Sequence, residues 1–101
     1  MTLEKVSSIE ITDEGVIVIV LESGGKPSYQ HVYRAAGGVY WNQDRKAFTF
    51  ATKKDGLYTK WFAHILNVVE DEMGIRLQLA KNVTWTGVSD DARNDLKWRY
   101  D

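Results

Sequence analysis

The sequence contains no cysteine and only one proline among its 101 residues. Without thiols it can form no disulfide bond, no thiolate metal site and no cysteine nucleophile. Its longest apolar run, residues 16–21, is six residues long, whereas a helix that crosses a bilayer needs about 20. Residues 1–5 lack the basic start and the apolar stretch of a secretory signal. Together these absences predict a cytoplasmic protein without a membrane partner.

Motifs that carry chemistry are equally scarce. No Ser, Asp or Glu lies at a recognised catalytic spacing from either histidine, His31 or His64. The glycine pairs at 24–25 and 37–38 lack the spacing and the following helix of a phosphate-binding loop. The three consecutive acids at 70–72 would point in different directions from a helix, so they make a poor metal cage. We therefore expect no catalytic residue, no metal ion and no cofactor.

What the sequence does contain is a middle segment that combines aromatic rings with positive charge. Residues 26–62 carry seven Lys or Arg against two Asp, a local charge of +5, whereas the whole chain has a net charge of −1. Aromatic residues recur through the same segment, which favours binding of a flat or anionic partner. The slightly acidic balance of the whole chain argues against a general binder of duplex DNA.

Length and composition predict one globular domain over residues 1–101, because 44% of the residues are apolar and 27% are charged. The first half shows strand patterns with short turns between them, and Gly37-Gly38 has the composition of a hairpin turn. We expect strands at 3–11, 16–22, 29–35, 39–42 and 47–51, followed late in the chain by two short strands at 75–79 and 83–86.

Helical spacing of apolar residues predicts a long helix at 57–73, capped by Asp55 and terminated by Gly74. On the polar face of this helix, His64 is predicted to be exposed and without a partner. An acidic first turn and a basic last turn predict a short carboxy-terminal helix at 89–100. The predicted fold is therefore α+β, an antiparallel meander sheet of about five to seven strands with the long helix packed on one face.

The register of the expected hairpins assigns side chains to faces of the sheet. A four-residue turn after Asn42 places Trp41 opposite Phe48, on a core-like face. The other face carries tyrosines, whose rings can be buried while their hydroxyls hydrogen-bond. With the basic turns, this face is the predicted ligand or partner site, formed by Tyr29, His31, Tyr33, Tyr40, Asn42, Arg45, Lys46, Lys53 and Lys54. A one-residue slip at the glycines would exchange the faces, and the tyrosines could instead pack under a loop or the last helix.

Residues 16–21 are all aliphatic, so both faces of this strand need cover. One long helix can cover only one face. We therefore expect the other face to be covered partly by the carboxy-terminal helix and partly by a second copy of the chain. The candidates for this core or dimer surface are Ile17, Ile19, Leu21, Leu96, Trp98 and Tyr100.

Residues 46–50, Lys-Ala-Phe-Thr-Phe, resemble the core of the longer conserved peptide of RNA-recognition-motif domains. In that family a basic residue precedes two aromatic residues at alternate strand positions, and the rings stack on bases. The resemblance implies single-stranded nucleic-acid binding through Phe48 and Phe50. This chain has Ala47 and Thr49 where the family has glycines, and several strands precede its first helix, so the order of elements differs from that fold.

The sequence thus favours a small non-enzymatic binding or interaction module, working as a homodimer, that takes an anionic or aromatic small ligand or a protein partner. Single-stranded nucleic-acid binding through the same rings is an alternative, which a steep loss of affinity with salt would reveal. A small enzyme with a cleft between sheet and helix, using His31 or a buried acid, is a second alternative. In size and composition the chain resembles single-domain proteins carried on bacterial mobile elements, including integron gene cassettes and phage, although no motif carries this likeness.

Overall fold

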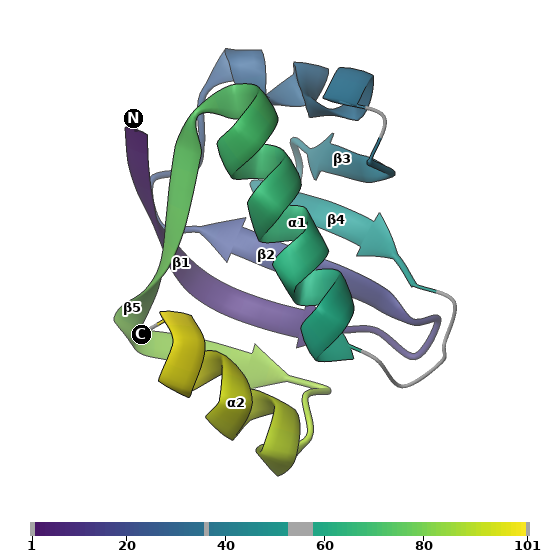
Figure 1. The fold of residues 1–101 in the computed structure, drawn as a ribbon, viewed down its shortest axis with the longest axis vertical. Coiled ribbons are helices and arrows are strands. Elements are labelled where there is room, and N and C mark those ends of the chain that lie inside the picture. Colours follow the sequence, from purple (N-terminus) through teal and green to yellow (C-terminus); the bar gives the residue numbers. More distant parts are fainter. Residues whose placement is uncertain (1, 36, 53–57, 101) are drawn as a thin grey trace.

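The computed structural model describes residues 2–35, 37–52 and 58–100, and these residues form a five-stranded sheet and three helices (Figure 1). The α+β class predicted from the sequence is confirmed. Along the chain the elements are β1 (Thr2–Ile11), β2 (Val16–Leu21), the 3₁₀ helix η1 (Pro27–Ala35), β3 (Val39–Asn42), β4 (Ala47–Ala51), α1 (Tyr58–Met73), β5 (Ile75–Thr86) and α2 (Asp90–Tyr100).

The sheet is mixed, with the strand order β3-β4-β2-β1-β5. Neighbouring strands are antiparallel except for β1 and β5, which are parallel. The prediction of a purely antiparallel meander is therefore wrong. The reason is that α1 carries the chain from β4 across the sheet to the far edge, and a crossover of this kind joins strands that run in one direction (Figure 1). The two short strands expected late in the chain are a single strand, β5.

A bulge bends the edge of the sheet formed by β1 and β5. The pairing passes from Val6–Leu79 to Ser8–Thr84, so Ser7 alone lies opposite the four residues 80–83. An inserted residue shifts the alternation of side chains along a strand. Val6 and Ile9 consequently both belong to the buried core, although they are an odd number of residues apart.

The segment from Pro27 to Ala35 is a 3₁₀ helix and not the predicted strand. Pro27 occupies its first position, where the missing N–H costs nothing. Tyr29 and Val32 are both buried, and residues three apart share a face in a 3₁₀ helix. The expected hairpin at Gly37-Gly38 is also absent, because these glycines connect a helix, not a strand, to β3.

The ends of the two α-helices follow local signals. Gly74 ends α1 in the left-handed conformation with φ of 66°, and its N–H donates to the carbonyl of Glu70. The Ser89 hydroxyl accepts a hydrogen bond from the N–H of Ala92 and so caps α2. The predicted cap Asp55 and the first residue expected in the long helix, Leu57, lie outside the described residues.

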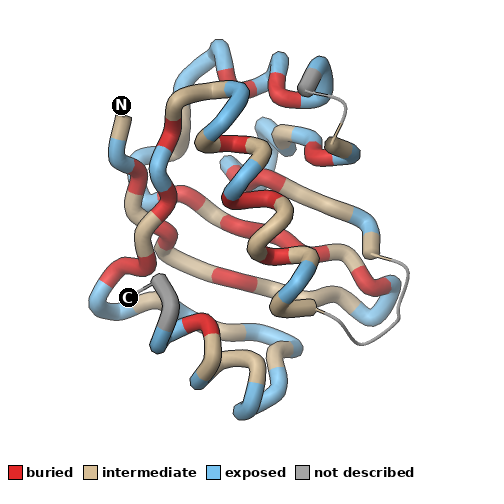
Figure 2. Tube along the Cα trace, viewed as in Figure 1, coloured by how far each residue is buried: buried red, intermediate tan, exposed pale blue. Residues whose placement is uncertain are grey.

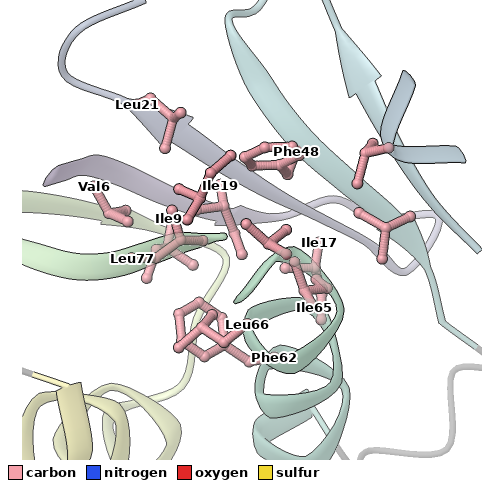
Figure 3. Close-up of a cluster of buried hydrophobic side chains, with 14 of the residues drawn as sticks. Val6, Ile9, Ile17, Ile19, Leu21, Phe48, Phe62, Ile65, Leu66 and Leu77 are labelled. Carbon is pink, nitrogen blue, oxygen red and sulfur yellow. The ribbon is translucent and has the colours of Figure 1, made fainter. Parts of the chain in front are cut away.

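One buried cluster joins the sheet to all three helices. Its centre lies where α1 crosses β1, β2 and β4 (Figure 1). Figure 2 shows the buried positions along these elements, and Figure 3 shows labelled side chains of the strands gathered beside those of α1. Burying each large aliphatic or aromatic side chain here contributes roughly 1.5–3 kcal/mol. The helices supply Tyr29 and Val32 from η1, Phe62, Ile65, Leu66 and Val69 from α1, and Leu96 from α2. All three helices therefore lie on the same side of the sheet.

Candidate functional site

The structure does not bring the predicted tyrosine face together as one surface. Tyr29 is 2% exposed and lies in the core, where its ring contacts Trp41 and Phe48 at centroid distances of 5.4 and 5.7 Å. Its hydroxyl donates a hydrogen bond to Glu4, a carboxylate that is itself buried. Burial, together with the hydrogen bond to Glu4 and the charge of that carboxylate, raises the pKa of Tyr29 above its usual range. Tyr29 therefore holds η1 against β1 and is not a surface ligand contact.

The other members of the predicted site lie in two places. His31 and Tyr33 are exposed on η1, where the Arg34 guanidinium lies 5.7 Å from the centroid of the Tyr33 ring. Tyr40 and Asn42 are exposed on β3. The turn that follows β3 contributes Arg45 and Lys46, and Lys53 and Lys54 lie outside the described residues.

The pairing of the strands defines the face of the sheet that points away from α1. Trp41 pairs with Phe48, as predicted, and both rings point into the core. The alternate residues share the opposite side of the sheet, and we call the part of that side beyond the β1–β5 bulge, from Ser8 onward in β1, the open face. It consists of Ser8, Glu10, Val16, Val18, Val20, Tyr40, Asn42, Ala47, Thr49, Ala51, Thr84 and Thr86.

The centre of the open face is aliphatic and its margins carry hydroxyl and amide groups. Val16 and Val20 are partly exposed and Ala51 is exposed, whereas Val18 is only 4% exposed. Serine and threonine residues lie along the β1–β5 side, and Tyr40, which is 59% exposed, lies on the β3 side. Because the described helices all pack on the other side of the sheet, none of them accounts for the burial of Val18.

An ion pair crosses this aliphatic centre. The Arg45 guanidinium donates to the Glu10 carboxylate at 2.6 Å, and the backbone N–H of Arg45 donates to the Asn42 side chain at 3.0 Å. Since β2 lies between β4 and β1, the Arg45 side chain has to pass over β2 to reach Glu10. Val18 pairs with Glu10 in the sheet, so it lies next to this ion pair.

The ion pair also makes the open face electrically neutral. Among the strand residues of this face, Glu10 is the one with a charge, and Arg45 compensates it. Lys5 and Arg76 alternate onto the same side of the sheet before the bulge, outside the open face. The arrangement resembles the anatomy of a protein–protein interface, which has an apolar centre and a polar rim. A surface for nucleic acid would instead carry uncompensated positive charge.

The predicted core or dimer residues separate into buried and exposed members. Ile17, Ile19 and Leu21 lie on the core face of β2 under α1, and Leu96 joins the same cluster from α2. Trp98 is 88% exposed on α2. The structure does not describe the side chain of Tyr100. The face of β2 without helical cover is therefore the one formed by its valines.

The rings of Phe48 and Phe50 lie on the core face, as the strand register predicts, which contradicts the base-stacking role that the resemblance implies for them. Phe48 is fully buried, and Phe50 stacks on Trp61 of α1 with centroids 5.2 Å apart, so both rings of the peptide that resembles RNA-recognition motifs face the core. The expectation that His64 is exposed and without a partner is wrong. His64 is partly buried, and its Nε2 donates to the Gly37 carbonyl at 2.7 Å. Gly37 lies 27 residues before His64 in the sequence. The residues next to His64 therefore gave no sign of this hydrogen bond.

Other kinds of site are weakly developed in the described part of the chain. Within residues 2–35, 37–52 and 58–100 no group of three or more histidines and acids could hold a metal ion, and none of the helices there is long and apolar enough to cross a membrane. A shallow hollow of about 280 Å³ lies at the β1–β5 bulge, lined by Lys5, Glu22, Ala80, Lys81 and Asn82.

Sequence reasoning missed Glu10 and the valine side of β2. Glu10 alternates with Ile9 and Ile11, which already placed it away from the core, but its ion pair with Arg45 joins residues 35 apart in sequence. Fold and surface together define a small α+β chain in which helices cover one side of the sheet and the other side is open.

Comparisons with known proteins add one structure. No protein-family model and no curated protein matches the chain. Among solved structures, it is similar to the integron cassette protein Hfx_Cass5, from the mobile metagenome of North West Arm Sewage Outfall, with 28% sequence identity, coverage of 97% of this chain and 95% of that chain, and a TM-score of 0.44. That protein is of the mobile-element type named above from size and composition. At this TM-score the likeness carries no argument about fold or function.

Proposed function

We propose that this chain is a small non-enzymatic interaction module that pairs with a second copy through the open face. One observation carries the proposal: every described helix packs on the same side of the sheet, while β2 is aliphatic on both sides. Partly exposed valines at the centre of a sheet are a surface that gains free energy when another apolar surface covers it.

The charge of the open face favours a second copy as the occupant. Two identical faces that each contain a balanced ion pair bring no uncompensated charge together. A nucleic acid would gain little from a neutral face, because phosphate contacts supply most of its affinity. Self-association through one patch repeated on both copies is the commonest arrangement of homodimers.

The size of the face sets the expected affinity. Five strands at spacings of about 4.8 Å make it roughly 19 Å wide, and five residues of strand make it roughly 17 Å long. Such an area, about 320 Å² per copy, is below the roughly 800 Å² per partner of a standard specific interface and belongs to weak, transient contacts. We therefore expect a weak dimer, with a dissociation constant in the micromolar range or above.

The test measures the mass of the protein in solution as its concentration rises. We expect analytical ultracentrifugation to show a monomer–dimer equilibrium for the native sequence. Val20→Lys adds a charge to the centre of the open face and should weaken association by about tenfold or more. Asn67→Lys adds the same charge at an exposed position of α1 and should leave association unchanged. A native chain that stays monomeric at millimolar concentration, or two variants with the same effect, would remove the proposal.

A further inference from the structure

The Arg45–Glu10 ion pair occupies the part of the open face on which a second copy would pack. The Arg45 side chain passes over β2 to reach Glu10, and Val18, which pairs with Glu10, is nearly inaccessible. Sheets that stack face to face lie about 10 Å apart and fill the space between them with interdigitating side chains. If both copies kept Arg45 folded across β2, the two guanidinium groups would be buried at the place where the valines of the two copies would pack.

The ion pair is built so that it can open. Both of its side chains are partly solvent-exposed, 47% for Arg45 and 25% for Glu10. A pair that water reaches contributes little to stability, because solvent and salt screen it. The same two charges attract each other more strongly once a second surface has excluded water from around them.

We propose that Arg45 and Glu10 exchange partners when two copies associate, so that Arg45 of each copy pairs with Glu10 of the other. This inference rests on the proposed function and names the residues that determine how the two faces recognise each other. A two-fold axis makes both exchanged pairs form together, since each copy offers the same two groups. The exchange keeps every buried charge compensated.

A charge-swap experiment tests whether these two positions meet opposite charges across the two copies. Arg45→Glu leaves two acids on the face, and Glu10→Arg leaves two arginines. Each variant alone should associate about tenfold or more weakly than the native chain, because every arrangement of its homodimer opposes like charges. An equimolar mixture should form a heterodimer with close to native affinity, because each copy then offers the charge that the other lacks.

The chain contains a matched control for this experiment. Arg76 and Glu70 form another exposed ion pair, at 3.3 Å, and Arg76 lies before the bulge of β5, at the other end of the strand from Thr84 and Thr86. Mixing Arg76→Glu with Glu70→Arg should give the same association as either variant alone. Thermal melts of all four variants would verify that each is folded.

A second measurement avoids charge reversal. The chain has no cysteine, so Arg45→Cys and Glu10→Cys chains each carry a single thiol. A short bis-maleimide should link the two chains when they are mixed. If the native chain dimerises but neither the charge-swapped mixture nor the cross-linker joins the two variants, the exchange is wrong and pairing through the open face stands. A native chain that stays monomeric would overturn both.

Discussion

At the scale of single residues, the chemical role expected for the tyrosines is correct for Tyr29, but its predicted location on a binding surface is wrong. The sequence indicated tyrosines whose rings are buried while their hydroxyls hydrogen-bond. Tyr29 does this in the core, against a buried Glu4 that also accepts a hydrogen bond from Ser23 at 2.7 Å. A carboxylate so far from water depends on its donors.

Replacing Tyr29 by Phe tests this role. Tyr29→Phe should lower the free energy of unfolding at neutral pH by about 1–3 kcal/mol, because Glu4 loses a donor. The pKa of Tyr29 is raised in the folded state, so its contribution is complete below the ordinary tyrosine pKa of about 10 and declines as the pH rises above it. Urea unfolding of the native chain should therefore show stability falling above about pH 10.

Tyr29→Phe should lack the part of the stability loss at alkaline pH that the ionisation of Tyr29 causes. Tyr40→Phe removes an exposed hydroxyl and should retain the native decline. An unchanged alkaline profile in Tyr29→Phe would contradict the assignment.

At the scale of elements, the boundaries of α1 and α2 were close to their predicted positions because caps and helical spacing are local signals. The segment from Pro27 to Ala35 was misassigned because two periods compete in it. Tyr29, His31 and Tyr33 recur at every second position, as on one face of a strand. Tyr29 and Val32 are instead three apart, and the burial of these two side chains favours the 3₁₀ helix. Whether such a segment forms a strand or a 3₁₀ helix depends on the surface against which it packs.

The connection between η1 and β3 offers a test of packing between elements. A Cβ at Gly37 would lie 2.6 Å from a methyl group of Val68 on α1. Gly37→Ala should therefore destabilise the fold by about 1–3 kcal/mol through overpacking. Val68→Ala removes the colliding methyl groups, so the double variant should be more stable than the sum of the two single effects predicts. Strictly additive effects in chemical denaturation would show that the close approach is not the cause.

At the scale of the whole molecule, the sequence indicated that both faces of β2 need cover, but it did not show which face the helices cover. An all-aliphatic strand indicated that one side would lack helical cover. The isoleucines and Leu21 were candidates for that side, and the structure places them under α1. The valine side is open because α2 packs beside α1 and β5, not behind the sheet.

Association and folding should therefore be coupled. A dimer of folded chains stabilises the folded state by mass action, so the melting temperature should rise with protein concentration. Differential scanning fluorimetry of the native chain should show this rise over a hundredfold range of concentration, roughly centred on the dissociation constant. Val20→Lys should show a clearly smaller rise over the same range of concentration. A melting temperature independent of concentration in the native chain would contradict pairing between folded copies.

By itself the sequence determined the α+β class, the positions of the main helices and the register of β3 on β4, because spacing, caps and short turns act over a few residues. Only the tertiary structure decided that β5 runs parallel beside β1, that residues 27–35 form a 3₁₀ helix packed on the core, and that Arg45 reaches Glu10. Each of these depends on a surface assembled from distant parts of the chain. Packing against such a surface outweighs the weak local preference of the segment involved.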